Sequence, residues 1–140
     1  MGNSDSVRTY SNRTLIDKGD AMRFDPVLTL VVIRSNDLEV SQAFYSAIGL
    51  EFVEEQHVNG PVHLAATLVE CVFEIYPSNG SASNTGTRLG FEVDSIADIL
   101  EALGDQVKII KPASREEGNN LHAVLEDPDG HKVELTERVW

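Results

Sequence analysis

The stretch Val124-Leu-Glu-Asp-Pro-Asp-Gly-His-Lys-Val-Glu-Leu-Thr-Glu137 decides the fold of this chain. Two alternating runs flank a turn made of Asp127, Pro128, Asp129 and Gly130, a pattern typical of a β-hairpin. In the second run the apolar residues alternate with Glu134, so its carboxylate points away from the core-forming face. A carboxylate at such a mid-strand position is a candidate functional group.

The elements before this hairpin occur twice in the same order. An apolar run at 27–33 predicts a central strand covered on both faces, and Asn36 or Asp37 can cap a helix that ends at Gly49. Three strands are expected next, at 51–57, 62–68 and 71–76. The second series has a strand at 88–93, a helix between Ser95 and Gly104, a strand at 107–110, a polar loop at 112–120 and the final hairpin. Corresponding positions lie about sixty residues apart, as a duplicated module would leave them.

Two of these motifs carry a family resemblance. The pattern Glu126-Asp-Pro-Asp-Gly followed by Glu134-Leu135, with Phe44-Tyr45 and Ile48-Gly49-Leu50 at the end of the first helix, resembles the vicinal oxygen chelate superfamily. That superfamily includes glyoxalase I, bleomycin-resistance proteins, fosfomycin-resistance enzymes and extradiol dioxygenases. The resemblance covers about 26–137. It implies an α+β fold in which two βαβββ modules form a cup-shaped mixed sheet with helices on the outer face.

Length and composition set the broad class. The 140 residues predict one domain of ordinary size, and the polar, aperiodic segment 1–25 predicts a flexible N-terminal extension. The resemblance implies that 26–140 is a glyoxalase-like domain, with modules at about 26–78 and 86–138. A net charge of -12 argues against nucleic acid as a partner, and no apolar run is long enough to cross a membrane. The single Cys71 is expected to be a buried thiol in an apolar strand. No signal peptide is visible, so a cytoplasmic protein is expected, and the resemblance implies a homodimer.

The resemblance also locates a metal site, and the sequence departs from it. In the metal-dependent relatives, each module supplies one ligand from its first strand and one from its last strand. Those positions are Leu30 and Glu74 in the first module and Arg88 and Glu134 in the second. Leu30 offers no ligand atom and Arg88 is a fixed cation, so we expect no metal cofactor here. We predict instead that Arg88 bridges to Glu74, to Glu134 or to both.

Such a bridge has two interpretations. It could be an ion network that replaces the metal as a tie between the modules. Alternatively, Arg88 could bind an anionic or carbonyl-bearing ligand, with Glu134 or Glu74 as the catalytic base.

Three further residues are ligand-binding candidates because of their predicted faces. His63 shares a sheet face with Glu74, Tyr76 would form a pocket wall beside it, and His122 would face the pocket from the strand before Glu134. A divalent metal held by His63, Glu74 and Glu134 is the alternative arrangement. We expect His57 and His131 to lie at solvated turn or edge positions, and Phe44 and Tyr45 to pack in the core.

Three functions remain open on these grounds. The first is metal-independent binding of a small molecule in the central cup, as in bleomycin-resistance proteins. The second is a metal-dependent lyase, isomerase or dioxygenase with a non-standard metal site. The third is an interaction module that has kept the fold and lost the pocket. The sequence contains no glycine-rich phosphate loop, no nucleophile elbow and no paired-cysteine zinc pattern.

Overall fold

The first module consists of a strand, a helix and three further strands. The computed structural model describes residues 15–18, 21–80, 86–115 and 120–139. The elements of this module are β3 (Leu30–Ser35), α2 (Leu38–Ile48), β4 (Phe52–Glu55), β5 (His63–Thr67) and β6 (Val72–Pro77). The four strands form one sheet in the order β3-β6-β5-β4, in which β3 and β6 are parallel and the other neighbours are antiparallel.

The second module repeats this plan. Its elements are β7 (Arg88–Val93), α3 (Ile96–Leu103), the 3-10 turn η1 (Gly104–Gln106), β8 (Lys108–Ser114), β9 (His122–Glu126) and β10 (Lys132–Glu137). The sheet order is β7-β10-β9-β8, with the parallel pair again formed by the first and last strands. The predicted α+β fold of two βαβββ modules is confirmed. The two modules form two four-stranded sheets.

Both helices begin and end at residues that the sequence marks. The Asp37 carboxylate accepts hydrogen bonds from the first backbone N–H groups of α2, and Gly49 ends that helix at a φ of +126°, which favours glycine. Ser95 Oγ accepts from the Asp98 backbone N–H at 3.1 Å and caps α3 in the same way. The predicted helix boundaries are therefore correct.

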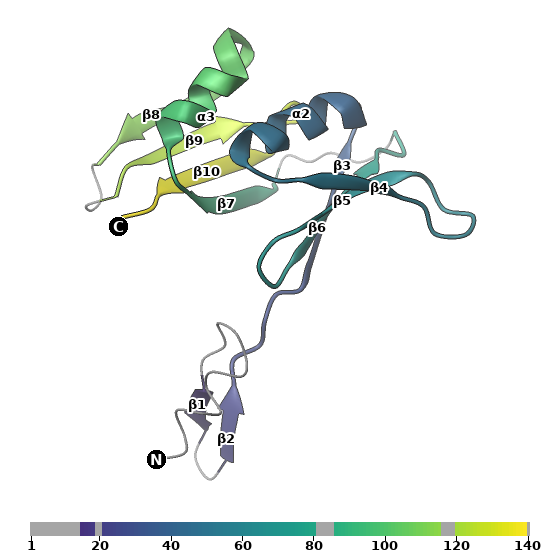
Figure 1. The fold of residues 1–140 in the computed structure, drawn as a ribbon, viewed down its shortest axis with the longest axis vertical. Helices are drawn as coiled ribbons and strands as arrows, with labels where there is room; N and C mark the ends of the chain where they lie inside the picture. The colour runs from purple at the N-terminus through teal and green to yellow at the C-terminus, as the bar shows by residue number, and fades with distance from the viewer. Residues whose placement is uncertain (1–14, 19–20, 81–85, 116–119, 140) are drawn as a thin grey trace.

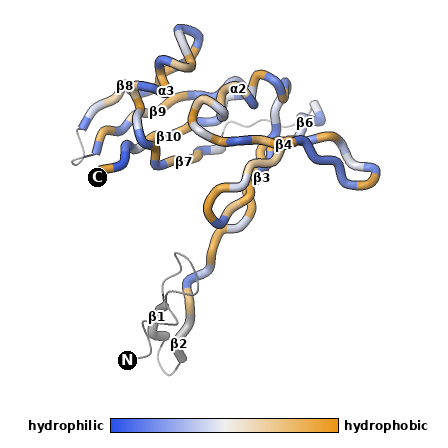
Figure 2. Tube along the Cα trace, viewed as in Figure 1, coloured by the Kyte–Doolittle hydropathy of each residue, from blue (hydrophilic) through white to orange (hydrophobic). Residues whose placement is uncertain are grey.

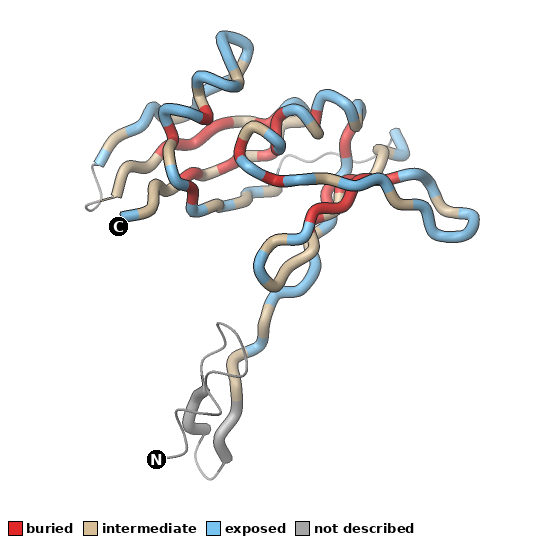
Figure 3. The backbone as a smooth tube through the Cα atoms, in the orientation of Figure 1, coloured by how far each residue is buried: buried red, intermediate tan, exposed pale blue. Residues whose placement is uncertain are grey.

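The core lies between the helices and the sheets. Figure 1 shows α2 and α3 side by side, and Figure 3 shows the buried residues where each helix meets its strands. Tyr45 is fully buried, and its ring centroid lies 5.1 Å from that of Phe73 and 5.0 Å from that of Phe44. The core role expected for Phe44 and Tyr45 is thus confirmed. No helix in the described residues is long and apolar enough to cross a membrane.

The prediction of a central strand at 27–33 was wrong. β3 begins at Leu30 and is an edge strand of its sheet. The run that leads into it is apolar in Figure 2 and largely exposed in Figure 3. The side chains of Leu30 and Val32 are 52% and 43% exposed. Ile33 on the other face is buried, because the helices cover only one side of the sheet.

Two smaller expectations also need correction. β8 continues through Pro112 to Ser114, where a polar loop was expected, and its pairing with β9 is interrupted by register shifts. An edge strand tolerates proline because one side of its backbone has no strand to bond. Cys71 precedes β6 and is partly exposed, so it is not a buried strand residue.

A short hairpin precedes the first module and was not predicted. β1 (Leu15–Lys18) pairs antiparallel with β2 (Ala21–Phe24), and Figure 1 shows this hairpin apart from the two sheets. Residues 1–14 lie outside the described part of the chain. A flexible extension at 1–25 therefore stays a prediction.

The turn of the final hairpin is organised by one buried carboxylate. Asp127 Oδ1 accepts from the backbone N–H groups of Asp129 and His131, both at 2.9 Å. Asp127 Oδ2 accepts from the Tyr45 hydroxyl and from His131 Nδ1, both at 2.6 Å. His131 is fully buried, so the expectation that it is solvated was wrong. Its ring is covered because the turn docks against α2.

The same turn joins the two modules through Asp129. Its Oδ1 accepts from the Asn36 backbone N–H at 2.8 Å, and its Oδ2 accepts from Ser41 Oγ at 3.1 Å. Ser41 Oγ also lies 2.6 Å from Ser35 Oγ at the end of β3. The turn is therefore bonded to the other module at two places, with Asp129 at the start of α2 and Asp127 at Tyr45 in its second half.

Asp127, His131 and Tyr45 form a buried cluster, and the pKa values of Asp127 and Tyr45 follow from burial and hydrogen bonding. Burial acts to raise the pKa of the Asp127 carboxyl, but the hydrogen bonds from His131 and Tyr45 outweigh it and hold the pKa below its usual value. Burial and the negative charge of Asp127 together raise the pKa of the Tyr45 hydroxyl. The cluster therefore holds an ionised aspartate beside a neutral tyrosine.

We predict that Asp127→Asn lowers the free energy of unfolding at pH 7 by about 1.5–3 kcal/mol, the contribution of hydrogen bonds to a charged group. The folded-state pKa of Asp127 lies below the unfolded value of about 3.9, so its stabilisation is complete above that pH and lost as pH falls through the folded-state pKa. The difference from wild type should shrink below about pH 4. Urea unfolding at pH 7 and pH 3 measures it.

The matched control is Glu101→Gln, which replaces an exposed carboxylate of α3 beyond its first turn. It should not produce the pH-dependent difference. A difference for Asp127→Asn that is the same at both pH values would contradict the ionised-carboxylate assignment.

Candidate functional site

In the second module, Glu134 lies on the sheet face opposite the helices. It pairs in register with Val124 of β9 and Gly90 of β7, as expected for the hairpin. The Nε–H of Arg88 donates to Glu134 Oε2, and His122 Nε2 lies 3.3 Å from Glu134 Oε1. The predicted Arg88–Glu134 bridge is thus present, and His122 lies beside it.

The Arg88–Glu134 pair is partly open to solvent, with the arginine side chain 58% exposed. The hydrogen bond from Arg88, followed by the contact with His122, holds the pKa of the Glu134 carboxyl below its usual value. Glu134 is therefore ionised at neutral pH. In the described interactions Arg88 does not reach Glu74, so the bridge forms within one module.

The first module has its own polar cluster on the equivalent face. His63 Nε2 lies 3.8 Å from Glu74 Oε2, and the His63 ring stacks on Tyr76 with centroids 4.1 Å apart and planes 8° from parallel. His63 is fully buried beneath these side chains. The predicted shared face of His63, Glu74 and Tyr76 is confirmed, and their role in binding stays a prediction.

Two residues of this cluster were not predicted to be site residues. Glu55 ends β4 and pairs directly with His63, and its Oε1 lies 3.4 Å from His63 Nε2. His57 lies in the turn after β4, is 68% exposed as expected, and its ring centroid is 5.1 Å from that of His63. Strand pairing of 51–57 with 62–68 is the signal that could have placed Glu55 opposite His63.

The alternative metal arrangement of His63, Glu74 and Glu134 is not the one assembled. Glu134 is held by Arg88 and His122. Among the residues that the structure describes, four side chains have ligand atoms that all lie within 4.8 Å of one another. They are Glu55, His57, His63 and Glu74.

The four positions of the family's metal site do not fit a divalent ion in this chain. Leu30 presents an exposed hydrocarbon side chain opposite Val72 of β6. Arg88 places a positive charge against Glu134, where a metal would need a free carboxylate oxygen.

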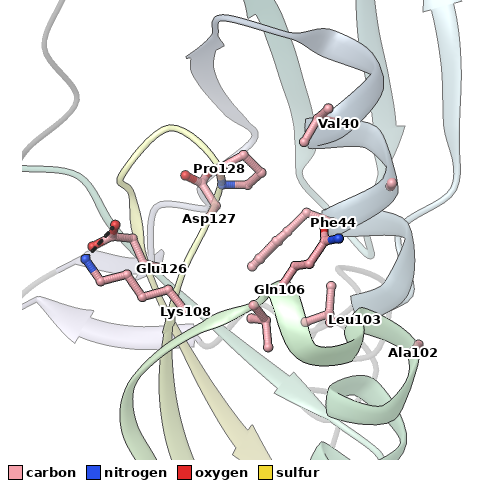
Figure 4. A pocket seen from close by; sticks show the side chains of 11 residues that line it. Val40, Phe44, Ala102, Leu103, Gln106, Lys108, Glu126, Asp127 and Pro128 are labelled. Atoms are coloured by element: carbon pink, nitrogen blue, oxygen red, sulfur yellow. Dashed lines mark ion pairs between the residues drawn. The ribbon is translucent and has the colours of Figure 1, made fainter.

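A cavity of about 460 Å³ lies elsewhere, on the helix side of the molecule. Figure 4 shows it between α2, the end of α3 and the turn at Asp127 and Pro128, with Phe44 and Leu103 on its apolar walls. Lys108 Nζ lies 3.5 Å from Glu126 Oε2 at its rim. None of the site residues predicted from the sequence lines this cavity.

Comparison with known families assigns the fold. The model of the glyoxalase/bleomycin resistance protein/dioxygenase superfamily matches residues 27–135. The chain belongs to this superfamily. None of the curated proteins matches its sequence.

Solved structures share the fold at low identity. A glyoxalase/bleomycin resistance protein from Albidiferax ferrireducens T118 is 24% identical with a TM-score of 0.63, covering 80% of this chain and 98% of that one. A glyoxalase family protein from Enterococcus faecalis is 22% identical with a TM-score of 0.61, covering 79% and 97%. The oxidase ChaP-H2 is 17% identical with a TM-score of 0.65, covering 82% and 95%.

We predict that Arg88→Met raises the pKa of the Glu134 carboxyl toward its ordinary value of about 4.3, because the main cause of the low pKa is removed. A ¹³C NMR titration of the glutamate carboxyl carbons measures it. Arg34→Met is the matched control, because Arg34 lies in the other sheet with its guanidinium 5.3 Å from the Tyr76 ring centroid. An unchanged Glu134 titration in Arg88→Met would show that the pair does not form in solution.

Proposed function

We propose that this chain binds a small organic molecule bearing a carboxylate or carbonyl group, with Arg88 as the main contact. Binding would use no metal at the four positions of the family's metal enzymes. The observation that carries the proposal is the Arg88–Glu134 pair, which stands where a metal and its ligand would otherwise be. Superfamily membership supports a small molecule as the class of partner.

The chemistry of the pair favours binding over catalysis. Arg88 has five N–H donors, and among the described residues only Glu134 engages one of them. Its planar fork suits a ligand carboxylate or carbonyl oxygen. Glu134, with its lowered pKa, is a good hydrogen-bond acceptor but a weak proton acceptor at neutral pH. It would therefore orient a donor group of the ligand, with His122 beside it.

A second candidate function is a metal-dependent lyase, isomerase or dioxygenase with a non-standard metal site. The observation that favours it is the group of Glu55, His57, His63 and Glu74.

We also propose that the protein acts in the cytoplasm. A chain with one cysteine builds no internal disulfide, which supports a reducing compartment.

We also propose that a second copy of the chain covers the open sheet faces in a homodimer. Leu30, Val32 and Val53 project from the same face of the first sheet as Glu74 and are all exposed. Apolar side chains grouped in this way are usually covered by a partner. A second copy laid on this face would turn the open sheets into an enclosed cup.

We predict that Val32→Lys shifts the protein from dimer to monomer, because it places a charge within this apolar surface. Light scattering during size-exclusion chromatography measures the mass. Val40→Lys, at an equally exposed valine of α2 on the helix side, should leave the dimer intact. A wild-type chain that is monomeric at micromolar concentration would refute the dimer.

We predict that small carboxylates and carbonyl compounds found by a thermal-shift screen in the presence of EDTA bind Arg88→Met at least about tenfold more weakly than wild type. A charge-assisted hydrogen bond contributes about 1.5–3 kcal/mol, which corresponds to that factor or more. Isothermal titration calorimetry on the hits measures the dissociation constants.

The control for this experiment is Lys108→Met, which removes an exposed cation at the rim of the helix-side cavity, away from the candidate ligand-binding residues. Its dissociation constants should match those of wild type. Ligands that bind Arg88→Met as tightly as wild type, or that bind only without EDTA, would overturn the proposal.

A further inference from the structure

The cluster on the first sheet is built from four side chains of three neighbouring strands and one turn. Glu55 ends β4, His63 begins β5, Glu74 lies in the middle of β6, and His57 follows β4. One ligand atom from each lies within 4.8 Å of every other. Four atoms bound tetrahedrally to one metal at about 2.1 Å lie about 3.4 Å apart, so the widest pairs of this group would need to close in by up to about 1.4 Å, a movement within reach of side-chain rotation.

The hydrogen bonding of His63 determines which of its ring nitrogens carries the hydrogen. His63 Nδ1 lies 3.2 Å from the Pro61 carbonyl oxygen, which can only accept, so Nδ1 carries the hydrogen. Nε2 of the neutral ring then presents a lone pair. Histidines that bind metals usually donate their other N–H to such a carbonyl, which holds the ring in the ligating orientation.

The Nε2 lone pair has no hydrogen-bond partner among the described residues, although it is buried. The polar atoms that approach it are the carboxylate oxygens of Glu55 at 3.4 Å and Glu74 at 3.8 Å. Three acceptors therefore converge on one point without a donor between them. A buried acceptor in this position is costly unless a cation fills the gap.

The distances favour a metal ion over a proton as that cation. A protonated Nε2 would draw a carboxylate oxygen to about 2.7–2.9 Å, as in other charge-assisted hydrogen bonds. The observed separations of 3.4 and 3.8 Å are longer than that and match the spacing of two atoms bound to one metal.

The turn that carries His57 supports the same interpretation. Val58 adopts a φ of +47°, which a β-branched residue rarely does, and it is the one non-glycine residue with positive φ in the described chain. The Gly60 N–H donates to the His57 carbonyl at 2.7 Å and closes the turn. Strained backbone of this kind is found where a side chain is held for binding. Here it brings the exposed His57 ring next to that of His63.

We propose that Glu55, His57, His63 and Glu74 bind one divalent transition-metal ion of the Zn²⁺ type, with His63 Nε2 as the buried anchor. Two imidazoles and two carboxylates suit such an ion better than Mg²⁺ or Ca²⁺, which prefer oxygen ligands alone. This site lies within one module and shares only Glu74 with the four family positions. It goes beyond the first proposed function, which needs no metal, and it would supply the non-standard metal site of the second candidate function.

The test is a titration of chelator-treated, full-length protein with Zn²⁺ by calorimetry and with Co²⁺ by visible absorption. We expect one ion per chain and a Co²⁺ spectrum that indicates nitrogen and oxygen ligands. Glu55→Gln and His57→Ala change side chains that are not fully buried, so the fold should persist. Each should weaken Zn²⁺ binding at least about tenfold. His63→Gln, with folding checked by circular dichroism, should abolish it.

The matched control is Glu54→Gln, because Glu54 is exposed and points to the opposite face of β4. It should bind Zn²⁺ as wild type does. Absence of stoichiometric Zn²⁺ binding by wild type, or equal binding by Glu55→Gln and His57→Ala, would overturn the proposal. Neither result touches the Arg88 proposal, since ligand binding at Arg88 is measured with EDTA present.

Discussion

The buried carboxylate of Asp127 is the constraint on which the rest of the structure depends. An ionised group removed from water is unstable unless donors satisfy its oxygens, and this one receives four hydrogen bonds. Two come from the backbone of its own turn and fix the hairpin. The hydrogen bond from Tyr45 comes from the other module. The carboxylate that shapes the turn therefore also bonds the two modules to each other.

The two modules share a backbone plan but place opposite electrostatics on corresponding faces. In the second module a guanidinium neutralises Glu134 and keeps it ionised. In the first module Glu74 lies beside a second carboxylate and an imidazole, without an arginine partner in the described interactions. The difference traces to the first strands, where Leu30 offers Glu74 no cationic partner and Arg88 pairs with Glu134. Our proposals accordingly assign an anionic or carbonyl ligand to the second module and a metal cation to the first.

Much of the fold could be predicted because its signals are local. Alternation around a turn specified the final hairpin, and the capping residues Asp37 and Ser95 specified where the helices begin. The face shared by His63, Glu74 and Tyr76 followed from strand periodicity alone. The Arg88–Glu134 pair followed from the family positions, because neighbouring parallel strands bring them together.

The wrong predictions concern features that depend on contacts between residues far apart in the chain. Periodicity gives the face on which a side chain lies but does not say which face is covered, and this is why β3 was expected to be buried on both sides. His131 was assigned to solvent because its burial depends on Tyr45, a residue far away in the chain. Glu55 and His57 were missed because their meeting with His63 requires the exact register of β4 on β5.

Because each module forms a separate sheet, the two modules together have four edge strands, and they are not equally protected against pairing with other molecules. β8 carries Pro112 and interrupted register, β4 is short and ends in two glutamates, and β7 carries charged residues. β3 has none of these protections before Arg34, its penultimate residue. The protein's resistance to aggregation during folding therefore depends on how quickly this one strand is covered.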